Sequence, residues 1–159
     1  MSTKLAAYFS ATGRTAKAAE KLAAYLGADI YEIRPEVPYT RADLNWMNKN
    51  SRSSVEMNNK SIRPAIITGD VDVSGYDTIY LGFPIWWYVA PTLINTFLHS
   101  YDLSSKKIVL FATSGSSGFG NTAAELQPSA PGAEIIEAKV LSGVITDEKV
   151  KTIIQASEK

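Results

Sequence analysis

Apolar residues in this chain gather in five short runs, at residues 4–9, 29–34, 78–83, 108–113 and 134–140. Segments with helical spacing of apolar residues follow these runs, the first at residues 16–26 and the last from about Thr146. Short helical segments are also expected after Pro91 and at residues 122–127. Strands that alternate with helices predict a parallel sheet with helices on both faces.

The apolar content of each run predicts its place in the sheet. The runs at 78–83 and 108–113 are almost continuously apolar, which is typical of central strands in a parallel sheet. The runs at 29–34 and 134–140 carry charged residues and suit the edges. We therefore expect an α/β fold, a three-layer α/β/α sandwich around a five-stranded parallel sheet in the order 2-1-3-4-5. Its first and third strands meet at a topological switch point. At 159 residues the chain is expected to be a single domain.

A long connection at residues 35–77 separates the second strand from the third. Within it, Thr40-Arg41-Ala42-Asp43 has the pattern of a capping box and predicts a helix through about Lys49. Residues 50–64 are polar and lack clear periodicity, so this excursion either passes over a functional site or is mobile. Three large apolar residues favour a packed arrangement: Trp46, Met47 and Met57.

Charge and composition exclude several classes of function. Sixteen basic and sixteen acidic residues cancel, and no basic cluster with interleaved aromatics occurs, which disfavours nucleic acid and membrane partners. The chain has no cysteine and one histidine, His99, so neither a thiol nucleophile nor a His-rich metal site is expected. No signal-peptide pattern and no run long enough to span a bilayer occur, so the cytoplasm is the expected location.

The segment after the first strand combines hydroxyls with a glycine: Ser10-Ala11-Thr12-Gly13-Arg14-Thr15. A helix begins within it, and a helix N-terminus offers unpaired N–H groups and a positive dipole end to a phosphate. Gly13 allows the backbone to approach such a ligand. The alternative is an ordinary strand-to-helix turn with a Ser or Thr cap.

Two further loops follow the third and fourth strands. The first, Pro84-Ile85-Trp86-Trp87-Tyr88, places three aromatics at a strand end, where a flat ligand can bind or the aromatics can pack under a neighbouring loop. The second, Ser114-Gly115-Ser116-Ser117-Gly118, lets a ligand approach the backbone, or is a plain flexible loop.

Other known site types are not found. The chain has neither a Gly-x-Ser-x-Gly elbow nor a Gly-x-Gly-x-x-Gly fingerprint after its first strand. Ser10 and Pro84 stand where a response regulator needs acidic residues. The side chains supply little chemistry of their own, so a cofactor must carry it.

With these three loops in this order, the sequence resembles the flavodoxin family, and the resemblance runs essentially from one end of the chain to the other. Residues 10–15 are similar to the family's FMN-phosphate loop, the most specific of the three; residues 84–88 and 114–120 fall at its two ring-binding loops. The resemblance implies that hydroxyls and backbone amides of the first loop hold the phosphate, while Trp87 or Tyr88 lies against the flavin ring. The implied FMN-binding residues are Ser10, Ala11, Thr12, Gly13, Arg14, Thr15, Pro84, Ile85, Trp86, Trp87, Tyr88, Ser114, Gly115, Ser116 and Gly118.

Two features depart from the family pattern. Arg14 replaces a more usual Asn and either faces the phosphate or points to water, and the balanced charge differs from the acidic surface of many electron-shuttling flavodoxins. The expected function is an FMN-binding electron carrier between redox partner proteins, without a catalytic side chain. One alternative is an FMN-dependent NAD(P)H:quinone-type oxidoreductase with a small quinone-like acceptor. Another is a flavodoxin-like binding module that has lost FMN.

Overall fold

A computed structural model describes residues 4–10, 13–45, 47–59, 62–68, 71–86, 89–114, 118–142 and 144–157. Five parallel strands form one sheet in the order β2-β1-β3-β4-β5. The strands are β1 (Lys4–Tyr8), β2 (Asp29–Glu32), β3 (Thr78–Pro84), β4 (Lys107–Thr113) and β5 (Glu134–Leu141). The sheet order and the fold class predicted from the sequence are confirmed.

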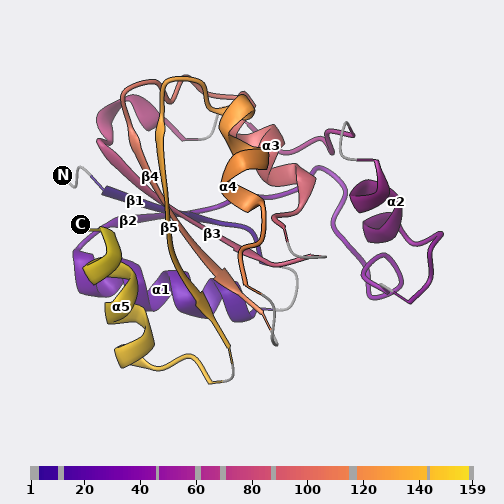
Figure 1. Cartoon of the computed structure of the whole chain (residues 1–159), viewed down its shortest axis with the longest axis horizontal. Coiled ribbons are helices and arrows are strands. Elements are labelled where there is room, and N and C mark those ends of the chain that lie inside the picture. The colour runs from indigo at the N-terminus through magenta and orange to yellow at the C-terminus, as the bar shows by residue number, and fades with distance from the viewer. Residues whose placement is uncertain are drawn as a thin grey trace.

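Helices cover both faces of this sheet, as Figure 1 shows. One face carries α1 (Arg14–Leu26) and α5 (Asp147–Ser157). The other carries α3 (Thr92–His99) and α4 (Thr122–Leu126), which continues into the 3₁₀ helix η2 (Gln127–Ser129). None of the helices in the described part of the chain is long and apolar enough to cross a bilayer.

The two central strands supply both layers of the core. Neighbouring residues of a strand point to opposite faces, so a strand buried on both sides reads as a continuous apolar run. Leu81 and Leu110 pack on the α3 side, while Tyr80 and Val109 pack on the α1 and α5 side. On that second side, Ala18 and its neighbour Ala19 are fully buried, and such small side chains let α1 lie close to the sheet.

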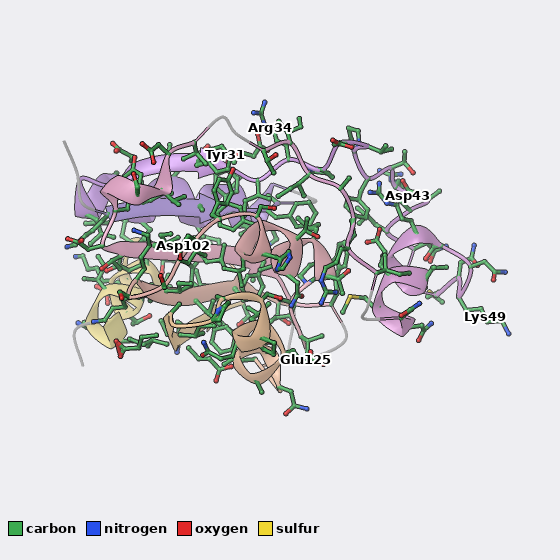
Figure 2. The ribbon with its side chains drawn as sticks, turned by 90° about the horizontal axis from the view of Figure 1, so that it is seen from above. Tyr31, Arg34, Asp43, Lys49, Asp102 and Glu125 are labelled. Carbon is green, nitrogen blue, oxygen red and sulfur yellow. The ribbon has the colours of Figure 1, made fainter. Side chains whose placement is uncertain are left out.

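The excursion between β2 and β3 leaves and returns through a short antiparallel neck. The Ile67 N–H donates to the Arg34 carbonyl at 2.8 Å, and the Glu36 N–H donates to the Ala65 carbonyl at 2.9 Å. Beyond the neck the chain projects away from the layered body and carries α2 (Arg52–Asn58), seen at the right of Figure 1. In Figure 2, Asp43 and Lys49 lie on this projecting part. The 3₁₀ helix η1 (Val73–Gly75) precedes β3.

The helix predicted from Thr40 to about Lys49 is wrong, although its capping box forms. The Thr40 N–H donates to Asp43 Oδ2 at 2.9 Å, and the Asp43 N–H donates to Thr40 Oγ1 at 3.1 Å. Over the described residues 40–45 and 47–49 only turns and bends follow. The side chains of Asn45 and Asn48 accept bonds from backbone N–H groups two residues on, which competes with helical hydrogen bonding.

A helix forms instead at α2, in the stretch whose sequence lacks periodicity. Ser51 is its N-cap, and the Ser51 hydroxyl accepts a bond from the Ser54 N–H. The packing expected of the large residues is found at Met57, which is 4% exposed, but not at Met47, which is 78% exposed. Trp46 lies outside the described residues.

Candidate cofactor site

The predicted phosphate loop lies between the end of β1 and the start of α1. The Gly13 N–H donates to Ser10 Oγ at 2.9 Å, and Gly13 has a φ of +94°, where a side chain would be strained. The first helical residue is Arg14, and the first turn of α1 carries no acidic residue. Ala11 and Thr12 lie outside the described residues. The described residues thus offer an anion a helix N-terminus without a competing carboxylate.

Thr15, predicted to donate a hydrogen bond to the phosphate, is buried and already hydrogen-bonded within the protein. It is 1% exposed, and its Oγ1 lies 2.8 Å from Oγ1 of Thr113, with either atom able to donate. This buried pair ties the start of α1 to the end of β4. The Thr15 hydroxyl can donate to another acceptor only when Thr113 donates within the pair. Sequence reasoning used Thr113 only as a strand end, and no motif marks it as a partner of Thr15.

The first ring-binding loop, residues 84–88, is called the first ring loop below, and it is anchored to the neighbouring strand β4. The Ile85 N–H donates to the Thr113 carbonyl at 3.0 Å, and Trp86 and Val89 exchange two backbone bonds of 2.9 and 3.2 Å. In this conformation the N–H groups of Ile85 and Trp86 are therefore engaged within the protein. Pro84 is the last residue of β3, and both Trp87 and Tyr88 lie outside the described residues.

The second ring loop, residues 114–120, begins at the end of β4. The Ser114 N–H donates to the Leu141 carbonyl at 3.0 Å, which fixes the loop's first residue against β5. Gly118 is exposed, and a Cβ added there would meet no atom within 4 Å. Gly115 and Ser116 lie outside the described residues. Because β1, β3 and β4 are parallel neighbours in the sheet, the three predicted loops all follow the carboxyl ends of adjacent strands.

An aromatic trio joins the excursion to two of these strand ends. Its members are Phe9, which follows β1, Tyr39 in the excursion, and Trp86 in the first ring loop. Ring centroids lie 5.6 Å apart for Phe9 and Tyr39, 5.9 Å for Phe9 and Trp86, and 5.4 Å for Tyr39 and Trp86. All three pairs are tilted or edge-on, the arrangements that aromatic quadrupoles favour. Trp86 therefore packs against the excursion, one of the two arrangements its sequence left open.

A polar cluster holds Tyr39 in place; we call Tyr39, Arg52 and Glu56 the Tyr39 latch. The Tyr39 hydroxyl donates to Glu56 Oε1, the Arg52 guanidinium carbon lies 3.9 Å from the Tyr39 ring centroid, and Arg52 Nε is 3.1 Å from Glu56 Oε2. Arg52 Nη1 also donates to the Val37 carbonyl at 2.6 Å. Burial, and then the bond to Glu56, raise the pKa of Tyr39 far above its usual value, so the phenol stays neutral.

The latch was missed by sequence reasoning. Arg52 and Glu56 have the i, i+4 spacing of a helical ion pair, which a reading of 50–64 as helix would have shown. Nothing in the sequence indicates that Tyr39, seventeen residues from Glu56, completes it.

The residues present suit FMN by the chemistry of their donors. Three features suit a phosphate: the N-terminus of α1, Gly13 with its positive φ, and the hydroxyls of Ser10 and Thr15. Within the described ranges, no three His, Asp or Glu side chains are placed to hold a metal ion. His99, the last residue of α3, is exposed.

Comparisons with known proteins agree with this arrangement. The family model described as flavodoxin matches residues 3–157. A candidate flavoprotein from Bacteroides uniformis is 48% identical, with 96% of this chain and 97% of that chain covered and a TM-score of 0.89. A candidate flavoprotein from Bacteroides eggerthii is 44% identical, with 98% of each chain covered and a TM-score of 0.85.

A more distant structure contains a cofactor. The flavoprotein from Lactobacillus acidophilus in complex with FMN is 23% identical, with 86% of this chain and 90% of that chain covered and a TM-score of 0.68. A search of curated proteins found no match. Because the family model spans nearly the whole chain and the sheet has the expected order, this chain belongs to the flavodoxin family.

Proposed function

We propose that this protein binds FMN and carries electrons between redox partner proteins. The observation that supports it most directly is the N-terminus of α1, which has Gly13 as its N-cap. This helix follows β1, which lies next to β3 in the sheet, so its N-terminus is at the topological switch point. Family membership and the FMN-bound flavoprotein of L. acidophilus support the cofactor. The proposed setting is the cytoplasm, the location expected from the sequence.

The protein's own part in this function is binding and orientation. The α1 N-terminus and the hydroxyls of Ser10 and Thr15 would hold the phosphate, and the loops after β3 and β4 would border the ring. Bound FMN supplies one- and two-electron transfer. Among the described residues of the three loops, Arg14 is the sole ionisable side chain. A carrier needs no acid or base there, which is why we favour it over an enzyme.

A second candidate is an FMN-dependent NAD(P)H:quinone-type oxidoreductase. It is favoured by the balanced charge of sixteen basic and sixteen acidic residues, since a carrier that docks on basic partners uses a strongly acidic surface. Oxidation of NADH or NADPH with a quinone, faster than with the same amount of free FMN, would favour the enzyme. Oxidation of NADH or NADPH no faster than with free FMN would exclude the oxidoreductase and favour the electron carrier.

The phosphate loop is tested by a matched pair of charge changes, one within the loop sequence and one in the last part of α1. Thr12→Glu brings a carboxylate to the proposed phosphate position, and Ala24→Glu adds the same charge at an exposed position in the last part of the helix. Like-charge repulsion and the loss of a charge-assisted hydrogen bond should weaken FMN binding about 100-fold or more in Thr12→Glu. Ala24→Glu should retain FMN as the unmodified protein does. Equal FMN affinity in both variants, measured by flavin fluorescence titration, would contradict this placement of the phosphate.

A further inference from the structure

Thr113, the last residue of β4, is connected to all three loops assigned to FMN. Its Oγ1 lies 2.8 Å from Oγ1 of Thr15 in the phosphate loop, and its carbonyl accepts a bond of 3.0 Å from the Ile85 N–H of the first ring loop. It also directly precedes Ser114, the first residue of the second ring loop. Thr113 thus joins the part of the site proposed for the phosphate to both parts proposed for the flavin ring.

The two hydrogen bonds of Thr113 come from different groups of the residue. The carbonyl that accepts from Ile85 belongs to the main chain, so it is present with any side chain at this position. The hydroxyl is the group that connects to the phosphate loop. A substitution that removes the hydroxyl therefore breaks the connection to Thr15 and keeps the connection to the first ring loop.

The hydroxyl of Thr113 stands where the strand is otherwise apolar. Alternate residues of a strand share a face, so Thr113 lies on the same face as Val109 and Phe111, which are fully buried under α1 and α5. Thr113 itself is 4% exposed. An apolar pair of the same shape would stabilise this position about equally well, because burying hydroxyls offsets most of what their bond contributes. What the hydroxyl pair adds is a fixed distance and orientation between its two partners.

Thr15 passes this constraint on to the start of α1. It lies in the first turn of the helix, which begins at Arg14 after the N-cap Gly13. The first N–H groups of a helix have no acceptor within it, and they are the groups proposed to hold the phosphate. A bond to the side chain of Thr15 fixes where these groups lie relative to the end of β4. Thr15 is 1% exposed, and this role needs no contact between its hydroxyl and the phosphate.

We infer that Thr113 is a positioning residue, which sets the distance between the phosphate-binding and ring-binding ends of the FMN site through its bond to Thr15. FMN carries its phosphate and its ring in one molecule, so both ends bind together best where the protein holds their partners at the matching spacing. Riboflavin lacks the phosphate and needs no such spacing. The inference rests on the proposed function, because it takes the α1 N-terminus and the two ring loops as the FMN site.

The test compares FMN with riboflavin in fluorescence titrations of the full chain freed of flavin. Thr113→Val removes the hydroxyl at nearly constant shape, and Thr113→Ser keeps it. Thr152→Val is the control, because it also removes one hydroxyl bond, to the Lys149 carbonyl within α5. Thr15→Val, alone and combined with Thr113→Val, completes a double-mutant cycle.

We expect Thr113→Val to weaken FMN binding about fivefold, the contribution of one hydrogen bond, and to leave riboflavin binding unchanged. Thr113→Ser and Thr152→Val should bind both flavins as the unmodified protein does. In the Thr15→Val background, Thr113→Val should cause no further loss of FMN affinity, because the bond that it would break is already absent.

Three results would overturn this inference and leave the proposed function standing. The first is an equal weakening of FMN and riboflavin binding in Thr113→Val, which would show a general loss of packing in the site. The second is an FMN affinity that Thr113→Val does not change. The third is the same loss with and without the Thr15 hydroxyl, which would mean that Thr113 acts independently of Thr15. Absence of FMN binding by the folded, unmodified protein would instead overturn the proposed function and this inference together.

Discussion

The sheet and the excursion are held together by different interactions. In the inner strands of the sheet, most residues are buried: Ile79, Leu81 and Ile108 are all at most 1% exposed. In the excursion, Val37 is 66% exposed and Met47 is 78% exposed. Apolar burial stabilises the first region through many small contributions, whereas the second relies on the neck and on the few contacts of the Tyr39 latch. Single substitutions should therefore act globally in the sheet and locally in the excursion.

The two regions meet at the candidate site. Trp86 of the first ring loop contacts both Phe9, next to β1, and Tyr39 of the excursion. The latch holds Tyr39 from the other side through Glu56. A change that frees the excursion would consequently alter the packing of Trp86 while the strands remain intact.

The largest effect is expected from Gly82→Ala in the central strand β3. A Cβ at this position would lie 2.3 Å from Cζ and 2.4 Å from Cε2 of Phe111, whose side chain is fully buried on the neighbouring strand. Such overpacking should lower the free energy of unfolding by about 3 kcal/mol. Urea denaturation measured by circular dichroism would show this as a lower midpoint across the whole structure.

Two further variants test the cause of that loss. Gly75→Ala, at an exposed glycine where a Cβ would meet nothing within 4 Å, should change the midpoint little. The double variant Gly82→Ala with Phe111→Leu should recover part of the loss, since the shorter side chain relieves the clash. If the double variant is no more stable than the sum of the single changes predicts, the clash with Phe111 is not the cause.

The same division separates what the sequence could predict from what it could not. The sheet order followed from the apolar content of each strand, because burial on both faces leaves a direct trace in composition. The capping box at Thr40 also formed. The Asn45 and Asn48 side chains then accept backbone hydrogen bonds that compete with those of a helix. The outcome of this local competition is hard to predict from sequence. The helix at α2 was missed because its seven residues carry too few apolar positions to show a period.

For the site, sequence reasoning found local motifs but not the contacts between distant segments. The strand–glycine–helix pattern around Gly13 is contiguous in sequence, so its geometry could be anticipated. The pair between Thr15 and Thr113 spans 98 residues, and it depends on which strands are neighbours and on the register of β4. The Tyr39 latch depends on how the excursion folds back on itself, and neither composition nor spacing indicates that.

A smaller and local effect is expected from Glu56→Ala in the latch. Glu56 is 6% exposed and accepts bonds from the Tyr39 hydroxyl and from Arg52 Nε. Losing both should lower the free energy of local opening of the excursion by about 2 kcal/mol. Hydrogen exchange followed by mass spectrometry should show faster exchange over residues 52–58, with the amides of β3 and β4 unchanged.

Glu36→Ala is the matched control for the latch. It removes the same charge from an exposed position in the neck, so exchange over residues 52–58 should stay as in the unmodified protein. Tyr39→Phe keeps the ring beside Trp86 and removes one bond, and it should give about half the effect of Glu56→Ala. Faster exchange of β3 and β4 in Glu56→Ala would show that the excursion and the sheet open together.

The smallest effect is expected at the second end of the excursion, where the Tyr76 hydroxyl donates to Asp29 Oδ2 of β2 at 2.7 Å. This bond, and then partial burial, raise the pKa of Tyr76 to about 12. The raised value means that the fold favours the protonated phenol. Its stabilisation is therefore complete below the unfolded pKa near 10 and is lost as the pH rises through about 12.

Removing the hydroxyl should reproduce that loss at neutral pH. Tyr76→Phe should be about 0.5 kcal/mol less stable than the unmodified protein below pH 9, since the bond is partly exposed to solvent. The difference should shrink between pH 10 and 12, where the unmodified protein loses the same bond by ionisation. Asp29→Asn removes the charge that holds the proton, so in that background the pH at which Tyr76 ionises should fall. No stability difference between the two proteins at any pH from 7 to 12 would show that Tyr76 anchors the excursion by packing of its ring, which Phe keeps, and not through Asp29.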